Sequence, residues 1–171
     1  VEIHKLEAII EAILFTMGES VEVEKIAAAI GHDAKTTKKL IHNLMDKYEK
    51  LKARLKELGS VLVSFSGGID STFLLTAAVE VLGDNACAVT GADESFPERE
   101  LEFTRDYCRE KGIRHYIVRT DPMKYEGCRN NTVKRCYYCK KSLFAQELKL
   151  ADKIGVSYVA EGSNADDSSD Y

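Results

Sequence analysis

Hydroxyl groups, one carboxylate and a pair of glycines are concentrated in residues 66–72, which read Ser-Gly-Gly-Ile-Asp-Ser-Thr. Adjacent glycines let a backbone turn sharply and approach a ligand closely, and N–H groups at the start of a helix attract negative charge. Asp70 could cap that helix or hold a magnesium ion that bridges phosphates. The pattern predicts a phosphate-binding loop whose candidate residues are Ser66, Gly67, Gly68, Asp70, Ser71 and Thr72.

The elements on either side of the loop favour a ligand over a plain turn. Residues 61–65 are apolar or small, as in a buried parallel strand, and an apolar helical run follows over 71–81. A glycine turn capped by Asp70, with no ligand, is the simpler alternative. The string is not a Walker loop, because no Gly-Lys-Ser/Thr follows, and it lacks the third glycine of the dinucleotide fingerprint.

Strands and helices alternate through the rest of the chain. We predict strands over 86–90, 116–118 and 156–160, a helix that begins near Ser95 and Pro97, an irregular stretch over 121–131 and a helix over 137–154. This alternation is typical of the α/β class with a doubly wound, mostly parallel sheet. Ligands bind at the carboxyl ends of such strands. Residues 90–93, which include Thr90, and residues 162–167 should therefore converge with the loop on one nucleotide.

The first fifty residues have a helical pattern instead. Gly18 and Gly31 end two short helices, and Asp33 can cap a third. We predict a three-helix, helix-turn-helix-like module over 1–48 and a nucleotide-binding domain over 49–171, joined by one continuous helix of about 34–58. The third helix is rich in lysine, which we interpret as a solvated face, and a DNA-reading helix is the less favoured alternative. The apolar residues at helical spacing in the first helix are Ile3, Leu6, Ile9, Ile10, Ile13, Leu14 and Met17.

Composition narrows the classes of protein that fit. The 171 residues are 44% hydrophobic and 30% charged with a net charge of −4, which indicates a globular chain and argues against general nucleic-acid binding. We find no apolar run of membrane-spanning length and no signal peptide, so we expect a cytoplasmic location with reduced cysteines. Cys136 and Cys139, with Cys128 nearby, could form a metal or redox pair, although a reduced structural pair is favoured. We interpret the Val1 start and the end at Tyr171 as signs of a fragment or of an unusual start.

Residues 66–71 look like the pyrophosphate loop of the N-type ATP pyrophosphatase (PP-loop) superfamily. Three further strings, Phe96-Pro-Glu-Arg-Glu-Leu101, Arg135-Cys-Tyr-Tyr-Cys-Lys-Lys-Ser-Leu-Phe144 and Gly162-Ser-Asn-Ala-Asp-Asp167, are similar to the ATP-dependent sacrificial sulfur transferases of nickel-pincer nucleotide biosynthesis. The resemblance covers about residues 48–171 and implies that ATP adenylylates a carboxylate of a pyridinium-biscarboxylate mononucleotide, releasing pyrophosphate, before a protein cysteine gives up its sulfur.

Carried over to this chain, the resemblance implies ATP and Mg²⁺ as cofactors. The loop would hold pyrophosphate and, through Asp70, the magnesium, while Asn164 and Asp167 lie near the nucleotide and Lys140 offers its charge to a phosphate. The family's sulfur-donating cysteine belongs to a later segment than this chain contains, so no catalytic cysteine is assigned and the domain is expected to be incomplete.

Residues 6–15, 18–21 and 41–48 resemble the first winged-helix domain of segregation and condensation protein B, over about residues 3–48. That likeness implies contact with a protein partner or a homo-oligomer through the N-terminal helices, rather than with DNA. A winged helix needs two strands after its third helix, whereas the leucine spacing here predicts that the helix continues. Two alternative functions stay open: an amide-forming relative of NAD and GMP synthetases, and a non-enzymatic interaction module.

Overall fold

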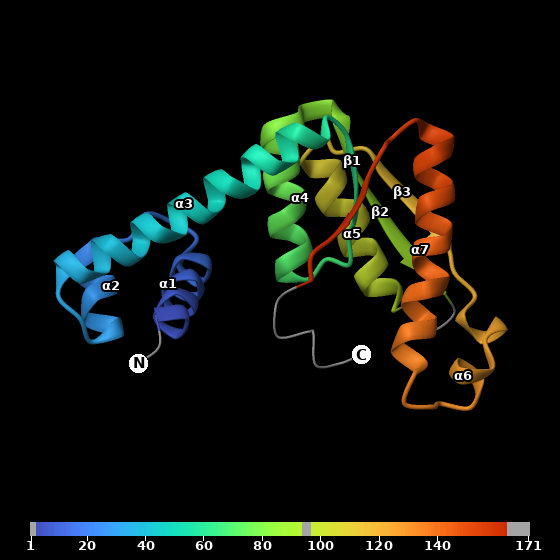
Figure 1. The fold of residues 1–171 in the computed structure, drawn as a ribbon, viewed down its shortest axis with the longest axis horizontal. Helices are drawn as coiled ribbons and strands as arrows, with labels where there is room; N and C mark the ends of the chain where they lie inside the picture. The colour runs from blue at the N-terminus through green and yellow to red at the C-terminus, as the bar shows by residue number, and fades with distance from the viewer. Residues whose placement is uncertain (1–2, 94–96, 164–171) are drawn as a thin grey trace. The chain divides into compact units, whose positions relative to one another are not determined.

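The computed structural model describes residues 3–93 and 97–163 (Figure 1). The chain divides into two compact units, Val1–Leu51 and Lys52–Tyr171. Helix α3 (Ala34–Leu58) runs unbroken through that boundary, as its leucine spacing predicts. Our division into domains at residues 48 and 49 stays a prediction, because a continuous helix marks no folding boundary of its own.

The first unit is helical. It contains α1 (Ile3–Met17), α2 (Val23–Ile30) and the first part of α3. α2 ends where predicted, because Gly31 adopts the left-handed conformation with φ +70°, and the next residue returns an N–H to the Ala27 carbonyl at 3.0 Å. Asp33 caps α3, accepting the Thr36 N–H at 2.9 Å. The core residues are Leu6, Ile10, Ile26, Ile30 and Leu40.

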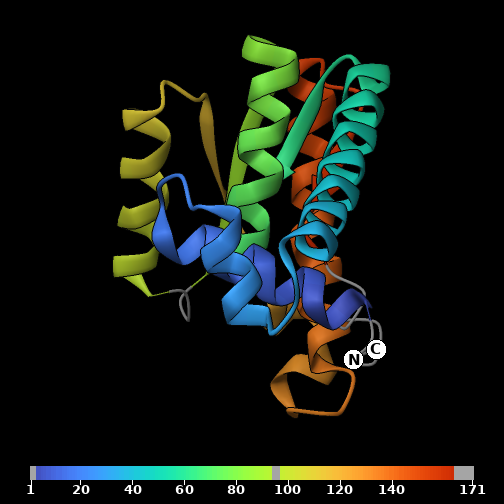
Figure 2. The same cartoon turned by 90° about the vertical axis from the view of Figure 1, so that its left-hand side faces the viewer.

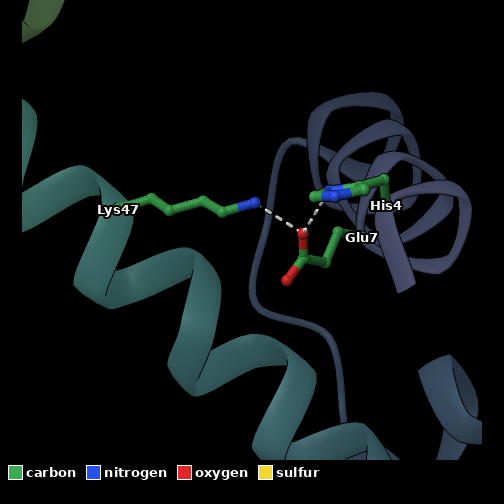
Figure 3. Close-up of polar contacts among 3 residues, drawn as sticks. All are labelled: His4, Glu7 and Lys47. Carbon is green, nitrogen blue, oxygen red and sulfur yellow. Dashed lines mark hydrogen bonds and ion pairs between the residues drawn. The ribbon is translucent and has the colours of Figure 1, made fainter. Parts of the chain in front are cut away.

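A buried carboxylate also joins α1 to α3 (Figure 3). Glu7 is only 4% exposed, and its Oε2 accepts a hydrogen bond from Lys47 Nζ at 2.5 Å. His4 Nδ1 lies 3.8 Å from the same oxygen. Because a buried carboxylate needs a compensating partner, Lys47 has a structural role in this unit and is not only part of a solvated basic face.

The helical pattern of α1 predicted more burial than the unit provides. Of its seven apolar positions, Leu6 and Ile10 are buried, and Ile13 packs partly against the core. The remaining apolar side chains face outward, because α2 and α3 cover one stripe of the helix only. The exposed members of that pattern are Ile3, Ile9, Leu14 and Met17, and Phe15, which is not part of the pattern, is exposed as well.

No wing follows the third helix in the described part of the chain. After Tyr48 the backbone stays helical to Leu58, and strand β1 (Val61–Ser64) pairs within the sheet of the second unit. The unit therefore has the three helices of a winged-helix domain without its two wing strands.

The second unit is built on a four-stranded parallel sheet with the order β3-β2-β1-β4. Strands β2 (Ala86–Ala92), β3 (His115–Arg119) and β4 (Val159–Glu161) join β1, with Val63 opposite both Ala88 and Ala160. The chain moves from β1 outward to β3 and then returns to the other side of β1. The strand order therefore reverses between β1 and β4, which is where ligands bind in sheets of this kind.

Helices cover both faces of this sheet. α4 (Ile69–Leu82) and α5 (Glu98–Glu110) lie on one face, and α7 (Arg135–Ile154) lies on the other (Figure 1, Figure 2). Residues Val61, Leu62 and Val63 have no exposed surface, as expected for a central parallel strand. The predicted doubly wound α/β fold is confirmed. Ser95, the predicted cap of α5, lies outside the described residues.

One strand start and one whole stretch differ from prediction by more than two residues. Strand β4 begins at Val159 rather than at 156, because Gly155 ends α7 with φ +72° and the Val156 N–H still bonds to the Ala151 carbonyl at 2.9 Å. The stretch 121–131 is not irregular: it contains the 3₁₀ helix η2 (Pro122–Lys124) and the one-turn helix α6 (Glu126–Arg129). Another 3₁₀ helix, η1 (Gly83–Asn85), follows α4. Such short elements carry no periodic signal.

Candidate active site at the carboxyl edge of the sheet

The loop after β1 is shaped by its glycines. Gly67 has φ +80°, and a Cβ there would lie 2.9 Å from the ring of Phe103 in α5. Gly68 is the N-terminal cap of α4, and its N–H donates to Ser66 Oγ at 3.3 Å. A side chain at Gly67 would be both strained and crowded, so the backbone needs glycine at this position.

The hydroxyl groups of the loop bond to one another and to its backbone. Ser66 Oγ and Ser71 Oγ are 3.1 Å apart. The Ser71 hydroxyl donates to the Gly68 carbonyl at 3.0 Å, and the Thr72 hydroxyl donates to the same oxygen at 2.8 Å. Asp70 is exposed in the first turn of α4. The structure therefore brings the predicted residues 66–72 together at a helix start, where the first N–H groups have no intrahelical acceptor.

Thr90 stabilises the start of the loop through a buried hydrogen bond. Its side chain is 1% exposed, and its hydroxyl donates to the Phe65 carbonyl at 2.7 Å. Because that hydroxyl hydrogen is used, the contact of 2.8 Å with His115 Nε2 requires the ring to donate. Burial, followed by the nearby charge of Arg105, lowers the pKa of His115 and favours the neutral ring. A direct contact of Thr90 with a nucleotide stays a prediction.

The segment after β4 lies directly against the first turn of α4. A Cβ at Gly162 would be 2.8 Å from both the Asp70 carbonyl carbon and the Ser71 nitrogen. Real Cβ atoms do not approach backbone that closely, so only glycine fits here. The ends of β1 and β4 thus meet at the point where the strand order reverses. Asn164 and Asp167, the next predicted site residues, lie outside the described residues.

Lys140 of α7 points to this edge and is paired. Its Nζ donates to Glu161 Oε1 at 2.5 Å, and the Ser163 hydroxyl donates to the same carboxylate oxygen. The side chains of Lys140 and Glu161 are 36% and 26% exposed, so the pair is neither fully buried nor free in solvent. Lys140 therefore lies beside the loop after β4, and its contact with a phosphate stays a prediction.

Glu147, two helical turns beyond Lys140, is a functional candidate that the sequence analysis missed. It has no exposed surface, and among the residues that the structure describes neither carboxylate oxygen makes a hydrogen bond of ordinary geometry. Burial raises the pKa of Glu147 to about 7, the Ser64 side chain opposes that rise in part, and Glu161 adds to it. Glu147 lies seven residues after Lys140, and residues at that spacing share one helix face. This spacing was the signal in the sequence that could have identified Glu147.

No preformed metal cluster is visible in the described ranges. Among residues 3–93 and 97–163, no three His, Cys, Asp or Glu side chains are grouped to hold an ion. A magnesium ion that bridges phosphates needs only one or two protein carboxylates, and Asp70 is placed to supply one. Its role as a magnesium ligand stays a prediction.

A glycine loop between a central parallel strand and a helix lies at the reversal point of the strand order in the second unit, which has a parallel α/β fold. The fold is close to that of an NH3-dependent NAD synthetase from Campylobacter jejuni, with a TM-score of 0.60 and 19% identity over 72% of this chain and 58% of that one.

Sequence relatives support the resemblance of the second unit to the sulfur transferases. The chain is 36% identical over 129 residues to the pyridinium-3,5-bisthiocarboxylic acid mononucleotide synthase of Lactiplantibacillus plantarum, covering 75% of this chain and 47% of that protein. It is 38% identical over 128 residues to an uncharacterized protein of Synechocystis, covering 75% of this chain and 48% of that protein. The chain thus spans about half the length of these two relatives.

The N-terminal part has relatives of its own. The family model for segregation and condensation complex subunit ScpB matches residues 8–68. A segregation and condensation protein B from Lachnoclostridium phytofermentans is 71% identical over 48 residues, which are 28% of this chain and 25% of that protein.

In the described residues, no helix has the length and apolar character needed to cross a membrane.

Proposed function

We propose that this chain binds Mg²⁺-ATP at residues 66–72 and activates a carboxylate by adenylylation, releasing pyrophosphate. The observation that carries the proposal is the meeting of the β1–α4 loop with Gly162 at the reversal point of the sheet. Backbone N–H groups at the start of α4, together with the Ser66 and Ser71 hydroxyls, can donate to the oxygens of a triphosphate.

Three side chains at this edge, Lys140, Glu161 and Asp70, have roles in the proposed reaction. A carboxylate oxygen of the acceptor attacks the α-phosphorus, and the bond to the β,γ-pyrophosphate breaks. Lys140 neutralises charge that develops on the phosphates, and Glu161 holds its ammonium until the nucleotide binds. Asp70, in the first turn of α4, would hold a magnesium ion, which would neutralise charge on the leaving pyrophosphate.

The acceptor we propose is a pyridinium-biscarboxylate mononucleotide, with sulfur transfer as the following step. The similarity to the Lactiplantibacillus synthase, whose name specifies a pyridinium bisthiocarboxylate product, supports this choice. Because the chain spans about half of that relative, the sulfur donor is not assigned to any cysteine here. An amide-forming reaction is less favoured, since the likeness to NAD synthetase concerns the fold alone.

Calorimetric titration with Mg²⁺-ATP tests the proposal. We expect saturable one-site binding by the chain, and at least about tenfold weaker binding after Asp70→Ala, equivalent to about 1.4 kcal/mol. Gly68→Val should abolish binding, because a branched side chain would cover the N–H groups that meet the phosphates. Asp84→Ala is the matched control, because Asp84 is an exposed aspartate beyond the other end of α4. Equal losses in the two aspartate variants would refute the site.

A second candidate function is protein binding through the N-terminal helices. The match to a condensation complex subunit and the exposed apolar side chains of α1, such as Phe15 and Met17, favour it. If the folded chain fails to bind Mg²⁺-ATP in the same titration, the interaction module becomes the better proposal. A cytoplasmic location, where ATP is available and thiols stay reduced, fits either function.

A further inference from the structure

Three cysteines gather where α6 meets α7, and the nucleotide proposal uses none of them. Cys128 in α6 is 5% exposed, Cys139 in α7 is partly exposed, and Cys136 is exposed near the start of α7. The Sγ atoms of Cys128 and Cys139 lie 3.6 Å apart. The other two cysteines, Cys87 and Cys108, are buried elsewhere in the unit.

The contact between Cys128 and Cys139 is close to bonding geometry. A disulfide joins sulfur atoms about 2.05 Å apart, so an approach of roughly 1.5 Å would complete the bond. The Cys128 thiol is also oriented, because its Sγ lies 3.6 Å from the Arg135 carbonyl oxygen. A short connection joins α6, which carries Cys128, to α7, which carries Cys139. Each of these thiols therefore has the other as its nearby partner.

Packing between α6 and α7 already holds the two thiols in place. The rings of Tyr125 and Tyr138 stack with centroids 5.5 Å apart. A Cβ at Gly127 would lie 2.3 Å from the Tyr138 ring, so the backbone of α6 rests directly on that ring. Little rearrangement is therefore needed to bring the sulfur atoms together, because the helices that carry them are already in contact.

We propose that Cys128 and Cys139 are a modification site: they form a reversible disulfide in the presence of a small-molecule disulfide such as oxidised glutathione. The Cys139 thiolate attacks one sulfur of that molecule, giving a mixed disulfide and releasing one thiolate. The Cys128 thiolate then attacks Sγ of Cys139 and releases the second. Two protein thiols become one disulfide, the small disulfide becomes two thiols, and the two thiol protons pass to the released thiolates.

Oxidation would change the part of α7 that lies beside the proposed nucleotide site. Asp93, the residue after β2, is among the charges that act on Cys139, and Lys140 is the next residue along α7. A disulfide would fix the first turns of α7 against α6 and close the intervening segment 129–138 into a loop. The pKa of Cys139 is raised, first by burial and then by the adjacent Cys128 thiol. Since the thiolate is the nucleophile, oxidation should accelerate as pH rises.

Tryptic peptide mapping of the whole chain tests the pairing without any nucleotide. The chain is oxidised in glutathione buffer, its remaining thiols are blocked, and trypsin then cleaves after Lys124, Arg129, Arg135 and Lys140. Cys128 falls in peptide 125–129, and Cys136 and Cys139 fall in peptide 136–140. We expect these two peptides linked with the loss of two hydrogens, and a rate that rises about tenfold from pH 7 to pH 8. A disulfide confined to peptide 136–140 would overturn the proposal.

Two matched variants identify the partner of Cys128. The cross-link should persist in Cys136→Ser and vanish in Cys139→Ser, whose partly exposed position makes a serine tolerable. Circular dichroism of each reduced variant establishes that it is folded before oxidation. A cross-link that persists in folded Cys139→Ser, or one that is lost in folded Cys136→Ser, would assign the bond to Cys136 and refute the pairing of Cys128 with Cys139.

Discussion

Replacing Glu147 by glutamine should change how the stability of the second unit depends on pH. The carboxyl is fully buried and makes no hydrogen bond of ordinary geometry within the described ranges. Its pKa is raised from an ordinary 4.5 to about 7, chiefly by burial. In the unfolded chain this group ionises near its ordinary pKa, whereas in the folded chain it keeps its proton to about pH 7. Folding is therefore unaffected by this group below pH 4.5 and is progressively opposed as pH rises to about 7.

The size of the effect follows from the two pKa values. Each pH unit between them changes the free energy of unfolding by about 1.4 kcal/mol, so the penalty at pH 8 is about 3 kcal/mol and most of it develops above pH 5. Glutamine cannot ionise, so the variant lacks this slope. A buried amide without a partner destabilises by about 1–3 kcal/mol, but that offset is the same at every pH.

Urea unfolding followed by circular dichroism at pH 5, 6, 7 and 8 measures the slope. We expect the stability of Glu147→Gln relative to the parent to rise by about 2–3 kcal/mol between pH 5 and pH 8. Glu110→Gln, at an exposed position at the end of α5, should run parallel to the parent. Parallel pH profiles for the parent and Glu147→Gln would refute the reasoning, because they would mean that this carboxyl ionises alike in the folded and unfolded chain.

Two further substitutions test the packing described above. Gly162→Ala should lower the free energy of unfolding by about 1–3 kcal/mol, because its Cβ would meet α4 backbone at 2.8 Å, whereas exposed Ser157→Ala should be nearly neutral in the same urea titration. Equal stability of these two variants would contradict the contact. A double-mutant cycle of Glu7→Gln and Lys47→Met should give a coupling of about 1 kcal/mol that shrinks in 1 M salt, because Lys47 is 55% exposed although Glu7 is buried; a coupling near zero would mean that solvent screens the pair completely.

The sequence predicted those parts of the fold that have a period. The strand over 61–65, the helices flanking it and the continuation of the third helix through residue 58 all follow from apolar spacing, and all are present with shifts of a few residues at their ends. The one-turn helix α6 was missed, because four residues are too few to show a helical pattern. Strand β4 begins three residues after the predicted start, because the hydrogen bonds that end α7 extend to Val156.

The candidate site was predicted in composition more than in geometry. Glycines and hydroxyls in residues 66–72 identified the loop, and strand order placed residue 162 beside it. The support of the loop by Thr90 and His115 depends on contacts between strands that are 25 residues apart, and no local pattern shows these. Glu147 was missed for a related reason: whether a glutamate within a helix is buried depends on what packs over it.

The placement of β4 beside β1 has a consequence for how the protein is made. Leu62 pairs with Val159, so translation of the central strand precedes translation of its neighbour by about 100 residues. At roughly 5–20 residues per second, the interval on the ribosome is on the order of 5–20 s. During that time one edge of β1 lacks its final partner, and such edges are prone to pair with other chains. Strand β4 therefore both covers that edge and brings Gly162 to the glycine loop.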